Sequence, residues 1–329
     1  NVTGVQTCAL PIFNAMDGFD ILSIAFASNG IAKEWNITTA ALGVVLSMEL
    51  IGMALGSVLL GGVADSIGRR KTLLGCLITM AFGMFMATTA GSPTQLSIWR
   101  VVTGLGIGGM LSCTNAVVAE FSSAKWRKLC ISIMVIGYPL GGGIGGVGAS
   151  GLINAYGWRS VFYLGASVTT LLLPLSFFLV PESVHWLTLK RPQGALEKIN
   201  ASLRKIGKSA VNALPELAPS QRKSSVADIF SPALIGITLV VTAAYFLHIV
   251  SFYFLAKWTP RIVGAMFPTL PGGTGPYVLA LTNFGGAAGG ALFGLLAGKV
   301  GLKRLTIVIM AMNMVAIVVF GRTPADLPM

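Results

Sequence analysis

The stretch Gly61-Gly62-Val63-Ala64-Asp65-Ser66-Ile67-Gly68-Arg69-Arg70-Lys71 decides the fold, because it places glycines and charges directly after a long apolar run. Gly61 and Gly68 permit a tight turn with close packing. Asp65 can cap a helix or pair with a cation, and the basic run suits an anionic lipid surface. The stretch therefore predicts a sharp connection between two helices at a membrane surface.

The same pattern recurs 233 positions later in the chain (285 − 52, for example). The matched pairs are Gly52 and Gly285, Gly56 and Gly289, Gly61 and Gly294, Gly68 and Gly301, with Arg70 matched by Lys303 and Lys71 by Arg304. Gly298 stands where the first copy has Asp65. The repeat predicts two pseudo-symmetric six-helix bundles, the second of which lacks its last three helices in this chain.

The composition identifies an all-α polytopic membrane protein. Of the 329 residues, 54% are hydrophobic and only 10% are charged, which is too little charge to cover the surface of a soluble protein. The 41 glycines follow no three-residue collagen period, so they indicate helices that pack backbone to backbone. Apolar blocks reach the length of about 20 residues that crosses a bilayer.

About nine membrane helices are expected from apolar run length, bounded by glycine, proline and charge. Their ranges are 13–32, 39–64, 72–90, 96–119, 129–153, 160–180, 232–258, 277–298 and 305–320. The predicted organisation is an N-terminal bundle at 13–181, a cytoplasmic linker at 182–231 with one amphipathic helix near 195–206, and a partial C-terminal bundle at 232–329.

Residues 1–12 are set apart from this organisation. Val2–Ile12 resembles the translation of a short-read sequencing adapter, so 1–12 is predicted to be artefactual or non-native. Native sequence is expected from near Phe13.

The net charge of +12 reflects membrane topology. Basic residues gather at Arg69–Lys71, Lys125–Lys128, Lys190–Lys223 and Lys299–Arg304, which are alternate loops, while the intervening loops hold few. This positive-inside pattern places those loops and the linker in the cytoplasm. It favours a lipid bilayer over nucleic acid as the partner.

Ionisable residues within the apolar runs are candidates for function, because a buried charge is costly without a partner. Arg100 opens a run with glycines at i+4 and i+8, on a face where a neighbouring helix can approach. Asp17 and Asp20 share one helix face at spacing i, i+3. Glu49 lies in mid-span, and a hydrogen-bonded structural role and a coupling role remain open for it.

Three motifs resemble those of known transporters. The loop at Gly61–Lys71 resembles the signature loop of the major facilitator superfamily, and Arg100-Val101-Val102-Thr103-Gly104 resembles its fourth-helix motif. Asp17-Gly18-Phe19-Asp20 resembles the mark of the aromatic acid:proton symporter family. The resemblance implies a gating loop of Gly61, Asp65, Gly68, Arg69 and Arg70. It also implies proton coupling by Asp17, Asp20 and Arg100, with Asp20 the better proton carrier and paired with Arg100.

Further polar residues are candidates for contact with substrate. Besides Arg100, these are Tyr245 and His248 in the seventh span, Asn115 in the fourth and Asn283 in the eighth. Lys257 is a weaker candidate, since it is expected near the membrane interface.

The resemblance implies a proton-coupled symporter, monomeric and in the bacterial inner membrane, that imports a small organic anion such as an aromatic carboxylate. A transporter of sugar or another metabolite, and a non-transporting sensor of the same fold, remain alternatives. An enzyme is not expected, because two histidines and scattered cysteines form no catalytic or metal-ligating set. No cofactor is expected.

Overall fold

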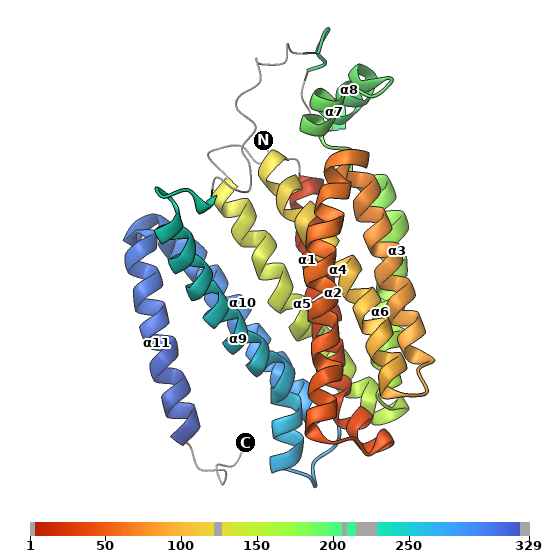
Figure 1. Cartoon of the computed structure of the whole chain (residues 1–329), viewed down its shortest axis with the longest axis vertical. Helices are drawn as coiled ribbons and strands as arrows, with labels where there is room; N and C mark the ends of the chain where they lie inside the picture. The colour runs from red at the N-terminus through yellow and green to blue at the C-terminus, as the bar shows by residue number, and fades with distance from the viewer. Residues whose placement is uncertain (1–3, 122–126, 206–208, 215–228, 323–329) are drawn as a thin grey trace.

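The computed structural model describes residues 4–121, 127–205, 209–214 and 229–322, and its regular elements are all helices (Figure 1). The long helices are α1 (Gly4–Trp35), α2 (Thr39–Ile67), α3 (Arg69–Thr88), α4 (Pro93–Phe121), α5 (Arg127–Tyr156), α6 (Arg159–Leu179), α9 (Ile235–Met266), α10 (Thr274–Val300) and α11 (Leu302–Arg322). Two short helices, α7 (Val184–Lys190) and α8 (Ala195–Lys205), stand between α6 and α9. The predicted all-α fold is confirmed.

Seven helices in the described part of the chain are long and apolar enough to cross a membrane: α2 to α6, α9 and α10. Their bounds follow the predicted spans to within a few residues, with one large exception. The seventh span, predicted to end at Trp258, continues in α9 to Met266 with Pro260 inside the helix. A proline is tolerated inside a membrane helix, because neighbouring helices can satisfy the backbone group that it frees, here the Ala256 carbonyl four residues earlier. Asn29 of α1 contacts the same turn, since its Nδ2 donates to the Pro260 carbonyl at 2.8 Å.

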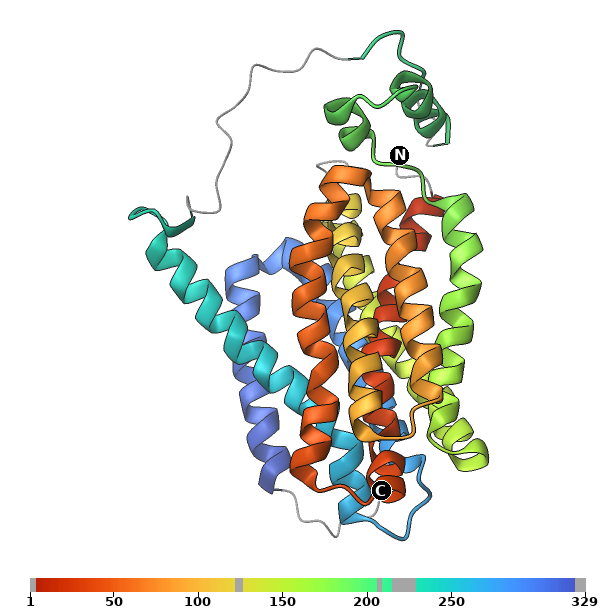
Figure 2. The same cartoon turned by 45° about the vertical axis from the view of Figure 1, so that its right-hand side comes forward.

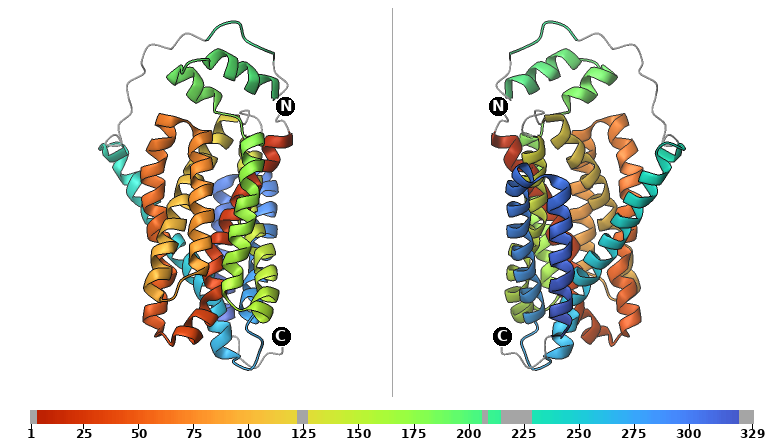
Figure 3. Two further views of the ribbon diagram at one scale, coloured as in Figure 1. Left: turned by 90° about the vertical axis from the view of Figure 1, so that its right-hand side faces the viewer. Right: turned by 90° about the vertical axis from the view of Figure 1, so that its left-hand side faces the viewer.

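The described part of the linker contains one helix more than the sequence predicts. The amphipathic helix expected near 195–206 is present as α8, but α7 was not anticipated. It begins because the Ser183 hydroxyl accepts a hydrogen bond from the Trp186 backbone N–H at 3.0 Å, as an N-cap does. Both short helices lie across one end of the bundle (Figure 3).

Helices α1 to α6 form one packed bundle. In it α2 lies along α4, α1 along α5, and α3 between α4 and α6. Glycines set the closest approaches, since a Cβ added at Gly52 or Gly56 would overlap backbone of α4, and one at Gly104 or Gly108 would overlap backbone of α2.

The three later helices attach to this bundle mainly along α1 and α5. α10 packs along α5, α9 contacts α10 and α1, and α11 contacts α10. The first half of α9 is exposed almost throughout, whereas Ala256, Lys257 and Pro260 in its second half are buried. Figure 2 shows α9 approaching the bundle as it runs away from the end that carries α7 and α8.

The two copies of the glycine repeat differ in their surroundings. Gly285 and Gly289 of α10 would meet nothing within 4 Å among the described residues if a Cβ were added, whereas their counterparts Gly52 and Gly56 touch α4. The repeat therefore preserves the positions of the glycines in sequence but gives them different neighbours in space.

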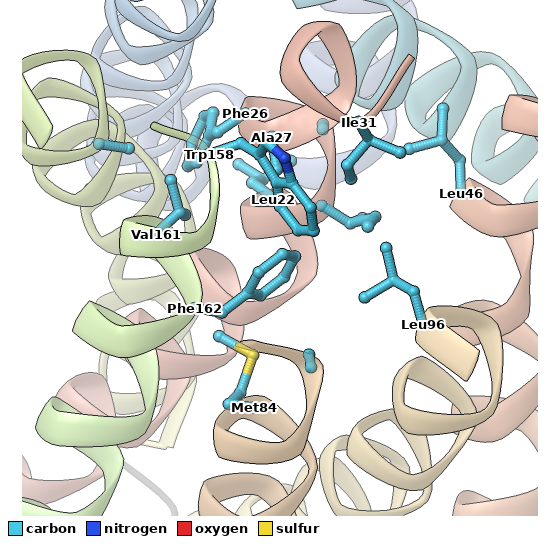
Figure 4. Close-up of a cluster of buried hydrophobic side chains, with 14 of the residues drawn as sticks. Leu22, Phe26, Ala27, Ile31, Leu46, Met84, Leu96, Trp158, Val161 and Phe162 are labelled. Atoms are coloured by element: carbon cyan, nitrogen blue, oxygen red, sulfur yellow. The ribbon is translucent and has the colours of Figure 1, made fainter. Parts of the chain in front are cut away.

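A cluster of buried apolar side chains fills the bundle at the far end from α7 and α8 (Figure 4). Its labelled members are Leu22, Phe26, Ala27 and Ile31 of α1, Leu46 of α2, Met84 of α3, Leu96 of α4, Val161 and Phe162 of α6, and Trp158 before α6. Met84 and Phe162 also contact the Arg100 side chain, so the cluster borders the charged residues described next.

Candidate functional site: a buried charge cluster between the helices

The Arg100 guanidinium is fully buried and bonded on three sides. Its Nη2 donates to the Asp20 carbonyl oxygen at 2.8 Å and to Glu49 Oε1, and its Nη1 lies 3.0 Å from Met84 Sδ. The Phe162 ring centroid lies 5.5 Å from the guanidinium carbon. Arg100 thus faces the bundle interior, the only arrangement in which an arginine inside an apolar span is inexpensive.

Glycine contacts explain how Arg100 reaches Glu49. Gly104 packs against the Glu49 carbonyl and Gly52 against the Val101 carbonyl, so α2 and α4 meet without intervening side chains. Residues three and four apart lie on one helix face, which aligns Glu49 with Gly52 and Arg100 with Gly104. The small residues therefore set the distance at which the two charges pair.

Glu49 also holds a second cation, from α9. Lys257 Nζ donates to Glu49 Oε2 at 2.7 Å and to the Ile21 carbonyl oxygen. Lys257 is 3% exposed and Glu49 fully buried. One carboxylate thus joins α2, α4 and α9, with each oxygen taking one cation.

The acids of α1 lie beside this cluster. Asp17 and Asp20 are fully buried, and in the described part of the chain their carboxyl oxygens have no hydrogen-bond partner. The Asp20 carboxyl is directed towards α6, because a Cβ added at Gly165 would lie 3.2 Å from Asp20 Oδ1. A buried carboxyl without a donor is more stable neutral than charged.

The predicted pairing of Asp20 with Arg100 takes a different form. Arg100 bonds the backbone carbonyl of Asp20, while Glu49 occupies the guanidinium as its carboxylate partner. The α1 backbone, and not the Asp20 side chain, is hydrogen-bonded to Arg100, and the Asp20 carboxyl has no donor among the described residues.

The predicted gating loop forms a second ionic cluster, at the end that carries α7 and α8. Arg69 lies 3.1 Å from Asp65 Oδ1 and 3.0 Å from Glu120 Oε1. Arg70 Nη2 donates to the Phe177 carbonyl at 2.5 Å, and its guanidinium stacks on the Phe177 ring at 4.8 Å. A Cβ added at Gly61 would meet Ser112 only at van der Waals distance, 3.8 Å.

Glu182 anchors this loop from the end of α6. Its Oε1 accepts from the backbone N–H groups of Arg69 at 2.8 Å, Arg70 at 3.2 Å and Ser183 at 3.0 Å. Gly68 has a φ of 107°, and a side chain there would collide with the Glu182 carboxylate. A carboxylate at the N-terminus of α3 is also favoured by the helix dipole.

The remaining predicted substrate residues lie apart from Arg100. Tyr245 is 66% exposed, and His248 and Asn115 are exposed as well. The His248 ring stacks on Phe252 with centroids 6.4 Å apart. Asn283 is half-buried against Gly142 of α5 and bonds its own helix at Leu279. Their roles as substrate ligands stay predictions.

Two functional candidates, Glu120 and Glu182, were not predicted from the sequence, and Lys257 was predicted only as a weaker one. Lys257 was placed near the interface, but the longer α9 puts it inside the helix and buries it. Glu120 and Glu182 carried a signal of their own, since each is a lone acid at a helix end on the side of the basic loops. Both bond the Arg69 region.

The family model described as Major Facilitator Superfamily matches residues 9–326. The chain belongs to this superfamily. It is therefore a multi-pass membrane protein of a transporter family and not an enzyme.

Among curated facilitator proteins, a gallate transporter from Pseudomonas putida is 28% identical over 308 residues, covering 93% of this chain and 68% of the relative. A 4-hydroxybenzoate transporter from Acinetobacter baylyi is 31% identical over 265 residues, covering 78% and 57%. The predicted resemblance to aromatic acid transporters is confirmed. The chain spans about two thirds or less of the length of these relatives.

A solved facilitator structure, the partially occluded inward-open conformation of the xylose transporter XylE from E. coli, matches with a TM-score of 0.72. It is 18% identical, and the match covers 90% of this chain and 71% of that one. At this identity the likeness shows the fold alone.

Proposed function

We propose that the chain is part of a proton-coupled symporter that imports a small aromatic carboxylate. The observation that carries the proposal is the buried cluster of Arg100, Lys257 and Glu49 beside Asp20, whose carboxyl has no hydrogen-bond donor among the described residues. Such a cluster inside membrane helices marks a substrate or proton pathway. The relatives that transport gallate and 4-hydroxybenzoate support an aromatic acid over a sugar as the substrate.

In this proposal Asp20 carries the proton. Its carboxyl is buried without a donor among the described residues, and it lies on the helix that Arg100 touches through the Asp20 carbonyl. Proton release gives Arg100 a second carboxylate to attract, so protonation alters how Arg100 is shared between α1 and α2. Asp17, one turn earlier on the same face, modulates that charge.

Alternating access completes the scheme. The bundle at 13–181 and the partial bundle at 232–329 rock about a central site, joined by the linker at 182–231. The loop of Asp65, Arg69 and Arg70 lies at the end that also carries α7 and α8. There the ion pairs of Arg69 with Asp65 and Glu120, and the hydrogen bonds from the loop backbone to Glu182, suit a gate. In this proposal the end that carries the basic loops faces the cytoplasm of a bacterial cell, which the positive-inside pattern supports.

The test is uptake of labelled 4-hydroxybenzoate into inverted and right-side-out vesicles that contain a full-length transporter with this sequence. We expect accumulation only with an inward proton gradient, and its loss in Asp20→Asn. Glu34→Gln, an exposed acid at the opposite rim of the bundle, is the matched control and should transport normally. Uptake that ignores the gradient, or an Asp20→Asn variant that accumulates like the parent, would refute coupling. Binding without uptake would favour a sensor.

A further inference from the structure

The Glu49 carboxylate binds two cations, as the carboxylate of a substrate would. Each of its oxygens takes one charged donor, Arg100 from the first bundle and Lys257 from the second. Both donors are buried, and each is also held by a backbone carbonyl of α1, at Asp20 or Ile21. Two convergent cations in a closed interior are the chemistry that recognises a carboxylate.

Of the two cations, Lys257 has the fewer contacts with the first bundle. Arg100 has contacts to Asp20, Glu49 and Met84, and it lies in the same bundle as all three. Lys257 crosses from α9 and has one carbonyl and one carboxylate partner. An incoming carboxylate can therefore replace Glu49 on Lys257 without dismantling the first bundle.

We infer that Glu49 is an internal competitor for the carboxylate of the substrate, and that substrate binds by displacing Glu49 from Lys257. The inference rests on the proposed function, since it assigns the site that recognises the transported anion. It also gives Glu49 a role: it fills the anion site when no substrate is present.

Charge balance determines what accompanies the displacement. A displaced Glu49 would be a buried carboxylate without its partner, so it must take up a proton. The proton passes from the Asp20 carboxyl to the Glu49 carboxylate, and the Asp20 carboxylate replaces Glu49 on Arg100. Each cation then has one carboxylate partner: Arg100 pairs with Asp20, and Lys257 pairs with the substrate. The proton is bound to Glu49.

Other ionisable groups face Glu49 and bear on its proton. They are Asp20 on α1, Arg100 on α4, Tyr138 on α5, and Tyr253 and Lys257 on α9. Asp17 on α1 acts on this set through Asp20. Among the described residues, only Arg100 and Lys257 bond Glu49 directly through its carboxylate. The exchange therefore depends on acids and cations of four different helices, and a test must hold their total charge constant.

Two double variants provide that test, because both leave a single cation and no Glu49 charge. Glu49→Gln/Arg100→Gln keeps Lys257, and Glu49→Gln/Lys257→Gln keeps Arg100. We measure binding of labelled 4-hydroxybenzoate to each in nanodiscs, using a full-length transporter with this sequence. The variant that keeps Lys257 should bind more tightly than the parent, by about tenfold if Glu49 fills the site in about nine molecules of ten. The variant that keeps Arg100 should bind more weakly than the parent.

The pH profile supplies a second readout. Parent binding should weaken as pH rises, since displacement of Glu49 needs a proton, whereas the variant that keeps Lys257 should bind with little dependence on pH. Equal affinities in the two double variants, or an unchanged pH profile, would overturn the inference. If neither the parent nor any variant binds an aromatic acid, the proposed function fails instead.

Discussion

Glu49 Oε2 lies 2.7 Å from Lys257 Nζ, which makes one buried ion pair a direct link between α2 and α9. The other Glu49 oxygen is bonded to Arg100, so the three residues carry a formal excess of one positive charge. This net charge determines how much stability the protein loses when Glu49, Arg100 or Lys257 is replaced by a neutral residue.

Glu49→Gln should be far more destabilising than Lys257→Gln. The first change leaves two cations buried together without a carboxylate, a kind of loss that typically costs about 3–5 kcal/mol. The second leaves Glu49 and Arg100 as a balanced pair. Thermal unfolding of both variants in one detergent checks the order, and equal melting temperatures would contradict it.

The glycine repeat offers a matched pair of substitutions. Gly52→Ala inserts a methyl group into the backbone contact with Val101, and such overpacking typically costs about 1–3 kcal/mol. Gly285→Ala, at the equivalent position of α10, meets nothing within 4 Å among the described residues. We expect it to be neutral or slightly stabilising, as alanine favours a helix over glycine. Melting temperatures of the two variants should separate, and a similar loss in both would refute the packing argument.

At the gating loop, Glu182→Gln should be more harmful than Asp65→Asn. Glu182 accepts three backbone N–H groups and is half-buried, and a hydrogen bond to a charged group contributes about 1.5–3 kcal/mol. The Asp65 side chain is 70% exposed, so its pair with Arg69 contributes at most about 1 kcal/mol. Limited proteolysis of the loop after α2 would report the difference. Faster cleavage in Asp65→Asn than in Glu182→Gln would contradict the assignment.

Glu34, at the rim of the bundle opposite α7 and α8, should make the stability of the protein depend on pH in the acid range. Hydrogen bonding from Arg159, followed by that from Trp158, outweighs partial burial and holds the Glu34 pKa below its usual value. A lowered carboxyl pKa adds stability above the unfolded pKa, about 4.3, which is lost as pH falls through the folded value. Glu34 is partly exposed, so the effect is at most about 1 kcal/mol. Melting curves recorded between pH 6 and about 3.5 should show a smaller loss of stability for Glu34→Gln than for the parent. The melting temperature at neutral pH should change little.

Apolar run length predicted the helices well, because a span must bury its whole backbone and so requires an unbroken apolar stretch. Charge pairing was less predictable. The side chains of Arg100 and Asp20 were expected to pair. Instead Glu49 is the carboxylate partner of the guanidinium, because Gly52 and Gly104 allow α2 to pack closely against α4. Nothing in a single sequence fixes such a rotation between helices.

Lys257 illustrates a different limit. Lys257 is the next-to-last residue of the predicted span 232–258, and a lysine near the end of a span normally extends to the interface. Its burial follows from the continuation of α9 to Met266 and from the two α1 and α2 acceptors that meet it. Both depend on contacts between residues more than two hundred positions apart.

The partners of Arg100 have an order along the chain that matters for biogenesis. Asp20, Glu49 and Met84 all precede Arg100, and both partners of Lys257, Ile21 and Glu49, precede that lysine. Because a protein is synthesised from its N-terminus, each cation leaves the ribosome after the groups that will neutralise it. During insertion, neither buried cation has to wait in the lipid for a helix that is still to be translated.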